Sequence, residues 1–352
     1  MKKFLSVLLV GAMAMSLAAC GSSSSSSSAE SDAAEETSEA EETEAASEET
    51  GDAEGSADGT VYHVGIIQLL EHDALDAATK GFEDALVELL GEDGVEFDFQ
   101  NAQGEETNCA TIATGFVAND VDLIMANATA ALQASSAATA DIPILGTSIT
   151  DYATALNISD WDGTSGTNIS GTSDLAPIDE QMDMLVELIP DVTKVGILYC
   201  SAEPNSQYQA KQAEAALDEK GIAWEEYTAA DSNEIQTIVT NAVTSCDALY
   251  VPTDNTMAAN VEIIKNIAVP AGVPMIAGEE GLCAGGVATL SISYYDLGYT
   301  TGKMAYEVLV NGADVSSMEI QYAPNVTKEY NPTICEELGI TVPDDYVAIE
   351  GY

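Results

Sequence analysis

The feature that most constrains the fold is an alternation of short apolar runs with amphipathic segments, which begins near residue 61. The run 61–69 is rich in β-branched residues and fits a strand that is buried on both faces. Residues 73–90 follow with apolar side chains at helical spacing, and Gly91 stops that pattern. Strands and helices that are joined by only a few residues predict a parallel sheet with helices on both faces.

The same rhythm continues toward the C-terminus. Further strands are predicted at 95–101, 122–127, 142–149, 194–200, 223–229, 248–252, 274–277 and 287–293. Further helices are predicted at 105–118, 130–139, 179–188, 205–220, 233–244, 255–269 and 296–310. A β-rich tail and a short helix near Cys335 finish the chain.

A Gly-, Ser- and Thr-rich stretch at 162–174 divides this pattern into two similar halves. We therefore expect an α/β fold of two doubly wound, Rossmann-like lobes that are joined by a hinge. The N-terminal lobe should comprise 61–174 plus 286–318, and the C-terminal lobe 175–285 plus 319–352. Because ligands bind beyond the C-terminal ends of the strands in such sheets, two facing lobes predict a cleft that closes by hinge motion.

The N-terminus predicts export and lipidation. Met1-Lys2-Lys3 precedes an apolar stretch that is too short to span a bilayer, and Leu17-Ala-Ala-Cys20 follows it. This is a lipobox, in which the Cys20 thiol accepts diacylglycerol before cleavage, so residues 1–20 are predicted to be a lipoprotein signal peptide. The alternative is an ordinary secretory signal with a chance cysteine. Either one predicts a protein that works outside the cytoplasmic membrane, and the lipobox adds a lipid anchor in the bilayer.

Residues 21–60 have the composition of a disordered tether. Seven serines stand at 22–28, and thirteen Asp or Glu without a basic residue occur between Glu30 and Asp58. Such a segment cannot bury enough apolar surface to offset its ordering entropy, and its own charge extends it. We expect it to hold the folded part away from the membrane and to carry no site.

Charge and residue usage exclude several functions. The formal net charge is −51, which argues against nucleic acid and against an anionic membrane surface as partners. All nine basic residues are Lys, so an anionic ligand group must bind to backbone N–H groups, hydroxyls, amides or Lys. Five widely spaced cysteines beyond Cys20 include no C-x-x-C motif, so neither a disulfide framework nor a metal site is predicted.

Polar side chains cluster at the C-terminal ends of the predicted strands, just before the next helix begins. Each one alone is most simply a helix N-cap, but their recurrence at nearly every strand end favours a polar cleft. The predicted ligand-binding residues are Gln68, His72, Thr129, Thr150, Asp151, Ser173, Asn205, Ser206, Asp254, Asn255 and Glu279. No cofactor is predicted.

Short motifs at these strand ends occur in a fixed order: GIIQLLEH at 65–72, NAQG at 101–104, AT at 128–129, TD at 150–151, GTSD at 171–174, EPNS at 203–206, PTDN at 252–255 and LG at 297–298. Together they resemble the ABC-transporter substrate-binding family that includes tryptophan- and tyrosine-type binding proteins. The resemblance covers the whole folded part. It implies a type I periplasmic-binding-protein fold and delivery of a small solute to an ABC permease with its ATPase.

The chain departs from the family pattern at two places beside the expected cleft. Ala130 and Tyr152 stand where the family usually has Pro, and the stretch 157–165 with Trp161 looks like an insertion. These departures leave the identity of the solute open.

If the solute is an amino acid, its carboxylate needs donors at helix N-termini, after Thr129 and around Asn205-Ser206. Its ammonium group needs carboxylates, and the sequence favours Asp254, Asp151 and Glu279. Tyr152, Leu70 or Trp161 would supply an apolar wall.

Other functions remain as alternatives. A nucleoside or a sugar could replace the amino acid, although low aromatic content and the absence of Arg disfavour a sugar. The protein could also act as the ligand-sensing subunit of a signalling system. An enzyme is disfavoured, because the chain has two His and no G-x-S-x-G, Walker A, early G-x-G-x-x-G or H-E-x-x-H motif.

Overall fold

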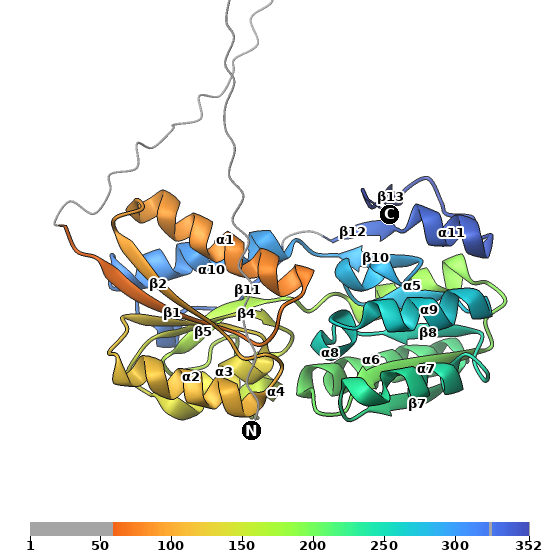
Figure 1. Cartoon of the computed structure of the whole chain (residues 1–352), viewed down its shortest axis with the longest axis horizontal. Coiled ribbons are helices and arrows are strands. Elements are labelled where there is room, and N and C mark those ends of the chain that lie inside the picture. The colour runs from red at the N-terminus through yellow and green to blue at the C-terminus, as the bar shows by residue number, and fades with distance from the viewer. Residues whose placement is uncertain (1–58, 324–325, 352) are drawn as a thin grey trace, which may run out of the picture. The chain divides into compact units, whose positions relative to one another are not determined.

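A computed structural model describes residues 59–323 and 326–351 (Figure 1). The predicted signal peptide, the lipidation site Cys20 and nearly all of the predicted tether lie outside these residues. Among these residues we find no helix with both the length and the hydrophobicity of a membrane span.

One lobe contains a six-stranded sheet in the order β11-β5-β4-β3-β1-β2, with all neighbours parallel. Its strands are β1 (Tyr62–Gln68), β2 (Val95–Asn101), β3 (Leu123–Asn127), β4 (Ile144–Ile149), β5 (Ile169–Ser173) and β11 (Gln321–Tyr322). Its helices are α1 (Asp73–Leu90), α2 (Glu106–Ala118), α3 (Thr129–Ala138), α4 (Tyr152–Leu156), α10 (Tyr294–Leu309) and the short η3 (Val315–Ser317). Helices α1 and α10 cover one face, and α2 and α3 cover the other (Figure 1).

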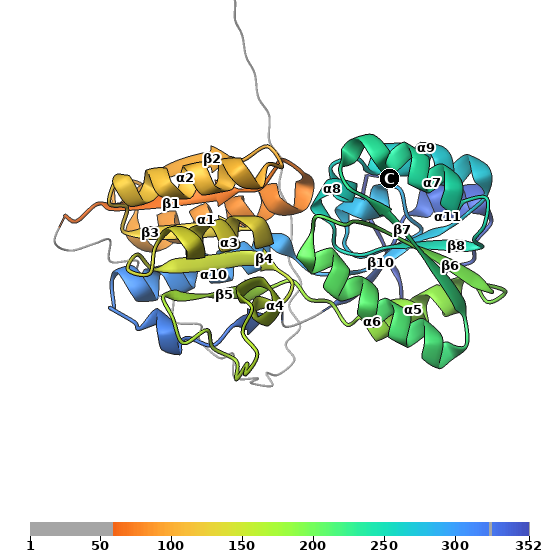
Figure 2. The same cartoon turned by 90° about the horizontal axis from the view of Figure 1, so that it is seen from below.

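The other lobe contains a seven-stranded sheet within the described residues, in the order β13-β12-β10-β9-β8-β6-β7. Its strands are β6 (Lys194–Cys200), β7 (Ala223–Ala229), β8 (Ala248–Val251), β9 (Met275–Ala277), β10 (Ala288–Ser291), β12 (Thr327–Tyr330) and β13 (Val347–Ala348). Its helices are α5 (Ile178–Leu188), α6 (Pro204–Lys220), η1 (Ser232–Glu234), α7 (Ile235–Ala242), α8 (Asn255–Ala258), α9 (Val261–Ala271), η2 (Gly281–Ala284) and α11 (Pro332–Leu338). Helices α5 and α6 lie against one face, and α7 and α9 against the other (Figure 2).

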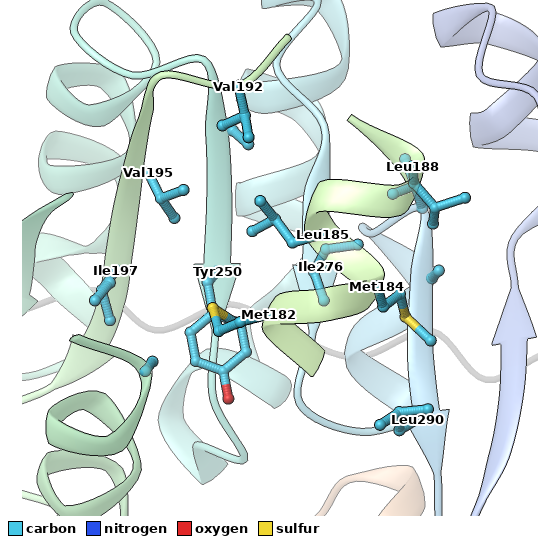
Figure 3. Packing of buried hydrophobic residues seen from close by; sticks show 14 of the residues in the cluster. Met182, Met184, Leu185, Leu188, Val192, Val195, Ile197, Tyr250, Ile276 and Leu290 are labelled. Atoms are coloured by element: carbon cyan, nitrogen blue, oxygen red, sulfur yellow. The ribbon is translucent and has the colours of Figure 1, made fainter. Parts of the chain in front are cut away.

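The second sheet has a closely packed core beneath α5. Tyr250 of β8 lies against Met182 and Leu185 of α5, with Ile197 and Ile276 on the neighbouring strands (Figure 3). The buried Tyr250 hydroxyl donates to Gln181 Oε1 at 2.6 Å, so the polar end of this ring is satisfied inside the core. The predicted architecture of two doubly wound α/β lobes is confirmed.

Two strands differ in sheet membership from the predicted lobe boundaries. The strand β10 was assigned to the N-terminal lobe, but it pairs with β9 and β12 in the second sheet. The strand β11 was assigned to the C-terminal lobe, but it pairs with β5 in the first. The chain therefore changes sheets between β10 and α10 and again between β11 and β12. An apolar run predicts a strand, but it does not tell which of two sheets the strand joins.

The Gly-, Ser- and Thr-rich stretch also contains a strand that the alternation of apolar runs did not predict. Strand β5 has small or polar residues after Ile169, and β4 and β5 approach closely at Gly171, whose φ is +141°. A Cβ atom on Gly171 would lie 2.0 Å from the Gly146 carbonyl oxygen, so only glycine fits there. The predicted helix 255–269 is also divided, into α8 and α9.

Candidate functional site

A small cavity lies where the C-terminal strand ends of both sheets meet. Its volume is about 10 Å³, which is room for no more than one water molecule. It is lined by His72, Leu75, Ser148, Thr150, Asp174, Asn205, Thr253, Asp254, Asn255, Ala258, Glu279 and Tyr294. Residues from both lobes contribute, so a solute that binds here must contact both.

The cavity brings together part of the predicted site. The predicted residues that line it are His72, Thr150, Asn205, Asp254, Asn255 and Glu279. The predicted residues that do not line it are Gln68, Thr129, Asp151, Ser173 and Ser206. The second group consists mainly of polar side chains that the fold itself uses.

The contacts of this second group explain their position. Gln68 is buried and accepts from the Thr79 hydroxyl at 2.7 Å, while Asp151 caps α4 by accepting from the Thr154 N–H at 2.7 Å. Ser173 Oγ donates to the Thr150 carbonyl at 2.9 Å. Thr129 and Ser206 are buried without reaching the cavity surface. In this arrangement these residues form caps and internal polar contacts, and their role in ligand binding stays a prediction.

Asp254 lines the cavity, but its carboxylate is already engaged. One oxygen accepts from the Cys200 N–H at 2.6 Å, and the other accepts from the Met257 N–H at 2.8 Å as the N-cap of α8. Burial raises the pKa of this carboxyl, and the nearby Glu203 carboxylate raises it further. Asp254 therefore shapes the wall of the cavity and has little capacity left for a ligand ammonium group.

Glu203 is the neighbouring capping residue. Its carboxylate accepts from the backbone N–H groups of Asn255 at 3.0 Å and Thr256 at 2.8 Å, and from the Asn205 side chain at 3.1 Å. These bonds tie the start of α6 to the start of α8. They fix Asn205 and Asn255 at the cavity edge.

His72 and Asn255 join the two lobes beside the cavity. The His72 Nε2 atom lies 3.2 Å from Asn255 Oδ1, and the Asn255 amide nitrogen in turn donates to Glu203 at 2.7 Å. Burial lowers the pKa of His72, while the Asn255 contact and Glu203 oppose that shift. The neutral imidazole that results can donate through Nε2–H to the Asn255 oxygen.

Glu279 also lines the cavity, and both of its oxygens are engaged. They accept from the backbone N–H groups of Gly281 at 2.6 Å and Leu282 at 2.7 Å. Burial raises the pKa of this carboxyl to about 7, despite those two bonds. Glu279 thus forms a rigid part of the wall.

Asp174 differs from these carboxylates. It is only 3% exposed, and its Oδ2 atom accepts from the Tyr294 hydroxyl at 2.9 Å. Its Oδ1 atom is buried and accepts no hydrogen bond from any residue that the structure describes. Burial raises the pKa of Asp174, and hydrogen bonding from the Tyr294 and Thr150 side chains and from the Asp174 backbone offsets part of this shift. A buried carboxylate oxygen without a donor is costly, so it calls for a partner from outside the chain.

Ser148 presents a second such atom in the same cavity. Its buried Oγ likewise has no hydrogen-bond partner among the described residues. Ser148 has a left-handed φ of +56°, and the pairing of β4 with β5 shifts register between Gly146 and Ile149. This β-bulge aims the end of β4 at the cavity. We call Asp174 Oδ1 and Ser148 Oγ the orphan pair.

The predicted apolar wall lies elsewhere. The Tyr152 hydroxyl donates to the carbonyls of Gly146 at 3.0 Å and Thr172 at 3.1 Å, and its ring stacks on Trp161 with centroids 6.4 Å apart. Leu70 and Trp161 pack against the core of the first lobe. None of these three side chains lines the cavity, and the backbone carbonyls of β4 and β5 hold Tyr152 inside its own lobe. Their contact with a solute stays a prediction. Leu75, Ala258 and the Tyr294 ring supply the apolar lining.

The strand-end pattern alone could not separate Asp174 from Ser173. Ser173 is the last residue of strand β5 and Asp174 follows it, so their side chains point to opposite sides of the strand. What distinguishes Asp174 as a candidate ligand-binding residue is its Oδ1 atom, which has no hydrogen-bond partner among the described residues. That signal depends on tertiary contacts.

Comparison with known proteins supplies the family. The sequence model described as ABC transporter substrate binding protein matches residues 63–350. A curated relative from Clostridioides difficile, the "Tyrosine-binding protein", is 38% identical over 257 residues, which is 70% of this chain and 72% of the relative.

Solved structures of similar proteins point to the same family. An ABC domain from Streptococcus pneumoniae in complex with L-Trp is 33% identical and covers 81% of this chain and 97% of its own, with a TM-score of 0.78. A ligand-free, open substrate-binding protein from Clostridium difficile is 34% identical over 83% of this chain and 100% of its own, with a TM-score of 0.64. The fold is thus the type I periplasmic-binding-protein fold that the motifs predicted. This chain belongs to the ABC transporter substrate-binding protein family, whose members bind solutes outside the cytoplasm for an ABC transporter.

Proposed function

We propose that this protein captures a free amino acid between its lobes, preferably an aromatic one, and presents it to the permease. The observation that carries the proposal is the orphan pair at the cavity. The relatives support the same ligand class, since one is named for tyrosine and another was solved with L-Trp.

The ammonium group of an amino acid fits the orphan pair chemically. It would donate to Asp174 Oδ1 and Ser148 Oγ, and its charge would compensate a carboxylate that burial destabilises. A sugar or a nucleoside brings hydroxyl or amide donors but no cation. The orphan pair therefore favours an amine over these alternatives.

The carboxylate of the amino acid needs donors at the opposite side of the cavity. The start of α6 is the candidate for this role, because Asn205 lines the cavity there. The Glu203 carboxylate precedes this helix, but it already accepts from the N–H groups of Asn255 and Thr256. The free N–H groups of this 17-residue helix carry partial positive charge. This arrangement needs no Arg, and the chain has none.

The size of the cavity implies motion. At about 10 Å³ it has no space for an amino acid, so the lobes must separate to admit one. The TM-score is higher with the L-Trp complex than with the open, ligand-free relative, 0.78 against 0.64, which supports a closed arrangement of the described lobes. In this proposal the solute stabilises the closed form, because it contacts both lobes at once.

The proposed role is binding without catalysis. The family is a solute-binding family and not an enzyme class. His72 is the one histidine of the cavity lining, and its Nε2 atom faces Asn255 and no nucleophile. A sensing role would use the same closure, and solute uptake by cells with and without the gene separates the two.

We propose further that Cys20 carries a lipid anchor. The support is the lipobox Leu17-Ala-Ala-Cys20 and the acidic segment after it. Cys20→Ser is expected to release the protein from the membrane fraction and to abolish incorporation of labelled fatty acid. Membrane retention of the Cys20→Ser protein would argue for another mode of attachment.

A thermal-shift screen tests the ligand class. An amino acid at a hundred times its dissociation constant should stabilise the protein by about 2.7 kcal/mol. The panel should include the proteinogenic amino acids, nucleosides and sugars. A melting temperature that rises with a nucleoside or a sugar, and with no amino acid, would contradict the proposal.

A further inference from the structure

The ligand cavity shares a wall with a second, larger cavity. This groove has a volume of about 690 Å³ and lies beside the segments that connect the two sheets. Tyr294 and Glu279 line both the groove and the ligand cavity. These two side chains therefore form a partition between the two spaces, and we call them the partition.

Both members of the partition are firmly held. The Tyr294 side chain is 7% exposed, packs against Ala74 and Ala78 of α1, and donates its hydroxyl to Asp174 Oδ2 at 2.9 Å. Glu279 is held by the N–H groups of Gly281 and Leu282. Tyr294 thus touches the same carboxylate that the proposed function assigns to the ligand ammonium group.

The groove beyond the partition is acidic and aromatic. Its ionisable lining residues other than Glu279 and the tyrosines are Asp73, Glu280, Asp296, Lys303 and Glu329. Ser291 donates to Glu280 at 3.3 Å, and Glu329 Oε2 is buried without a hydrogen-bond partner in the described chain. Rings of Tyr295, Tyr299 and Tyr322 complete the lining. Carboxylates and aromatic faces are the groups that attract an ammonium ion.

We propose that Tyr294 makes this protein selective for free amino acids by excluding peptides that are extended at the amino end. The inference rests on the proposed function, because it needs the ligand nitrogen to lie at Asp174. A residue added to that nitrogen would run into the Tyr294 ring. Behind the ring, the groove has both the volume for such a residue and the carboxylates for its displaced ammonium group. The partition therefore admits free amino acids and excludes peptides that are extended at the amino end.

Removing the ring should relax this selectivity. We suggest measuring the dissociation constants of L-tryptophan and glycyl-L-tryptophan, and of the corresponding tyrosine pair, by calorimetry. The wild-type protein should favour the free amino acid by about a hundredfold or more, and Tyr294→Ala should narrow that ratio at least about tenfold. Tyr294→Leu serves as a second variant that fills more of the space if the Ala variant is poorly folded.

Two further variants distinguish the effect of the Tyr294 ring on selectivity from the effect of its hydroxyl group and from that of a general loss of stability. Tyr294→Phe keeps the ring and loses the bond to Asp174, so it should weaken binding of the free amino acid and leave dipeptides excluded. Tyr306→Ala, on the same helix but outside both cavities, should leave the ratio unchanged.

The outcomes are distinguishable. A ratio that stays at the wild-type value in folded Tyr294→Ala and Tyr294→Leu proteins would overturn the inference and leave the proposed function intact. Wild-type protein that binds the dipeptides as tightly as the free amino acids would also overturn it. Wild-type protein that binds neither class would defeat the proposed function itself, and this inference with it.

Discussion

Asp174→Asn is expected to weaken amino acid binding by at least about a hundredfold while the ligand-free protein keeps or gains stability. Removing one partner of a buried ion pair typically costs about 3–5 kcal/mol. In the ligand-free protein the Asp174 carboxylate has no such partner among the described residues, so its neutral replacement removes a cost of burial. Asparagine retains an oxygen that can accept from Tyr294.

The pH dependence of this effect has a defined sign. Burial raises the pKa of Asp174 in the folded state above its value in the unfolded chain. The folded state therefore holds the proton more tightly, and stability from this group is lost as the pH rises through the raised pKa. The gain in stability of the ligand-free Asp174→Asn protein over the wild type should appear at neutral pH. It should vanish at a pH below the ordinary pKa of an Asp carboxyl, where both side chains are neutral.

Calorimetry and thermal denaturation of the same samples check this prediction. Asp151→Asn is the matched control, because Asp151 caps α4 and lies outside the cavity. It should retain amino acid affinity. If Asp174→Asn loses binding only together with a marked fall in the melting temperature of the ligand-free protein, Asp174 is structural. If Asp151→Asn loses binding and Asp174→Asn does not, the ammonium group lies at the other carboxylate.

Gly298→Ala should destabilise the protein by about 3 kcal/mol or more, although alanine is the better helix former. Helices α1 and α10 cross so closely that a Cβ atom on Gly298 would lie 1.9 Å from the Ala78 carbonyl oxygen. Backbone atoms cannot rotate away as a side chain can, so the helices must separate. Since α1 carries Leu75 and α10 begins with Tyr294, solute binding should weaken as well.

Urea unfolding of Gly298→Ala and Gly115→Ala measures this effect against a control. Gly115 lies inside α2, and no described atom would lie within 4 Å of its added Cβ apart from its own helix backbone and chain neighbours. Gly115→Ala should therefore be neutral or stabilise by up to about 1 kcal/mol. Equal unfolding midpoints for the two variants would show that the close approach of α1 and α10 does not limit stability.

The fold was predictable because each lobe repeats one local pattern. Buried strands such as β1 and β6 are continuous apolar runs, and α1 shows helical spacing and a glycine at its end. Strand β5 does not show this pattern, because after Ile169 it consists of Ser, Gly and Thr, and Gly171 lies close to the β4 backbone. The sheet to which β10 belongs depends on pairing between segments, which periodicity does not record.

The candidate site was only partly predictable, because capping and ligand binding select the same residue types. Asp254 and Asp174 both follow strands, and both are buried. In the folded chain, backbone N–H groups take both oxygens of Asp254, whereas one oxygen of Asp174 belongs to the orphan pair. The difference lies in contacts with distant segments such as Cys200 and Tyr294, which no local motif encodes.

The most direct test of the central claim compares each amino acid with its deaminated counterpart on the wild-type protein. Titrations of L-tryptophan against indolepropionate, and of L-tyrosine against hydroxyphenylpropionate, change only the group that should meet Asp174 and Ser148. We predict that at least one of the two amino acids binds and that its deaminated partner binds at least about a hundredfold more weakly. Equal affinity within the pair would contradict recognition of the ammonium group by the orphan pair.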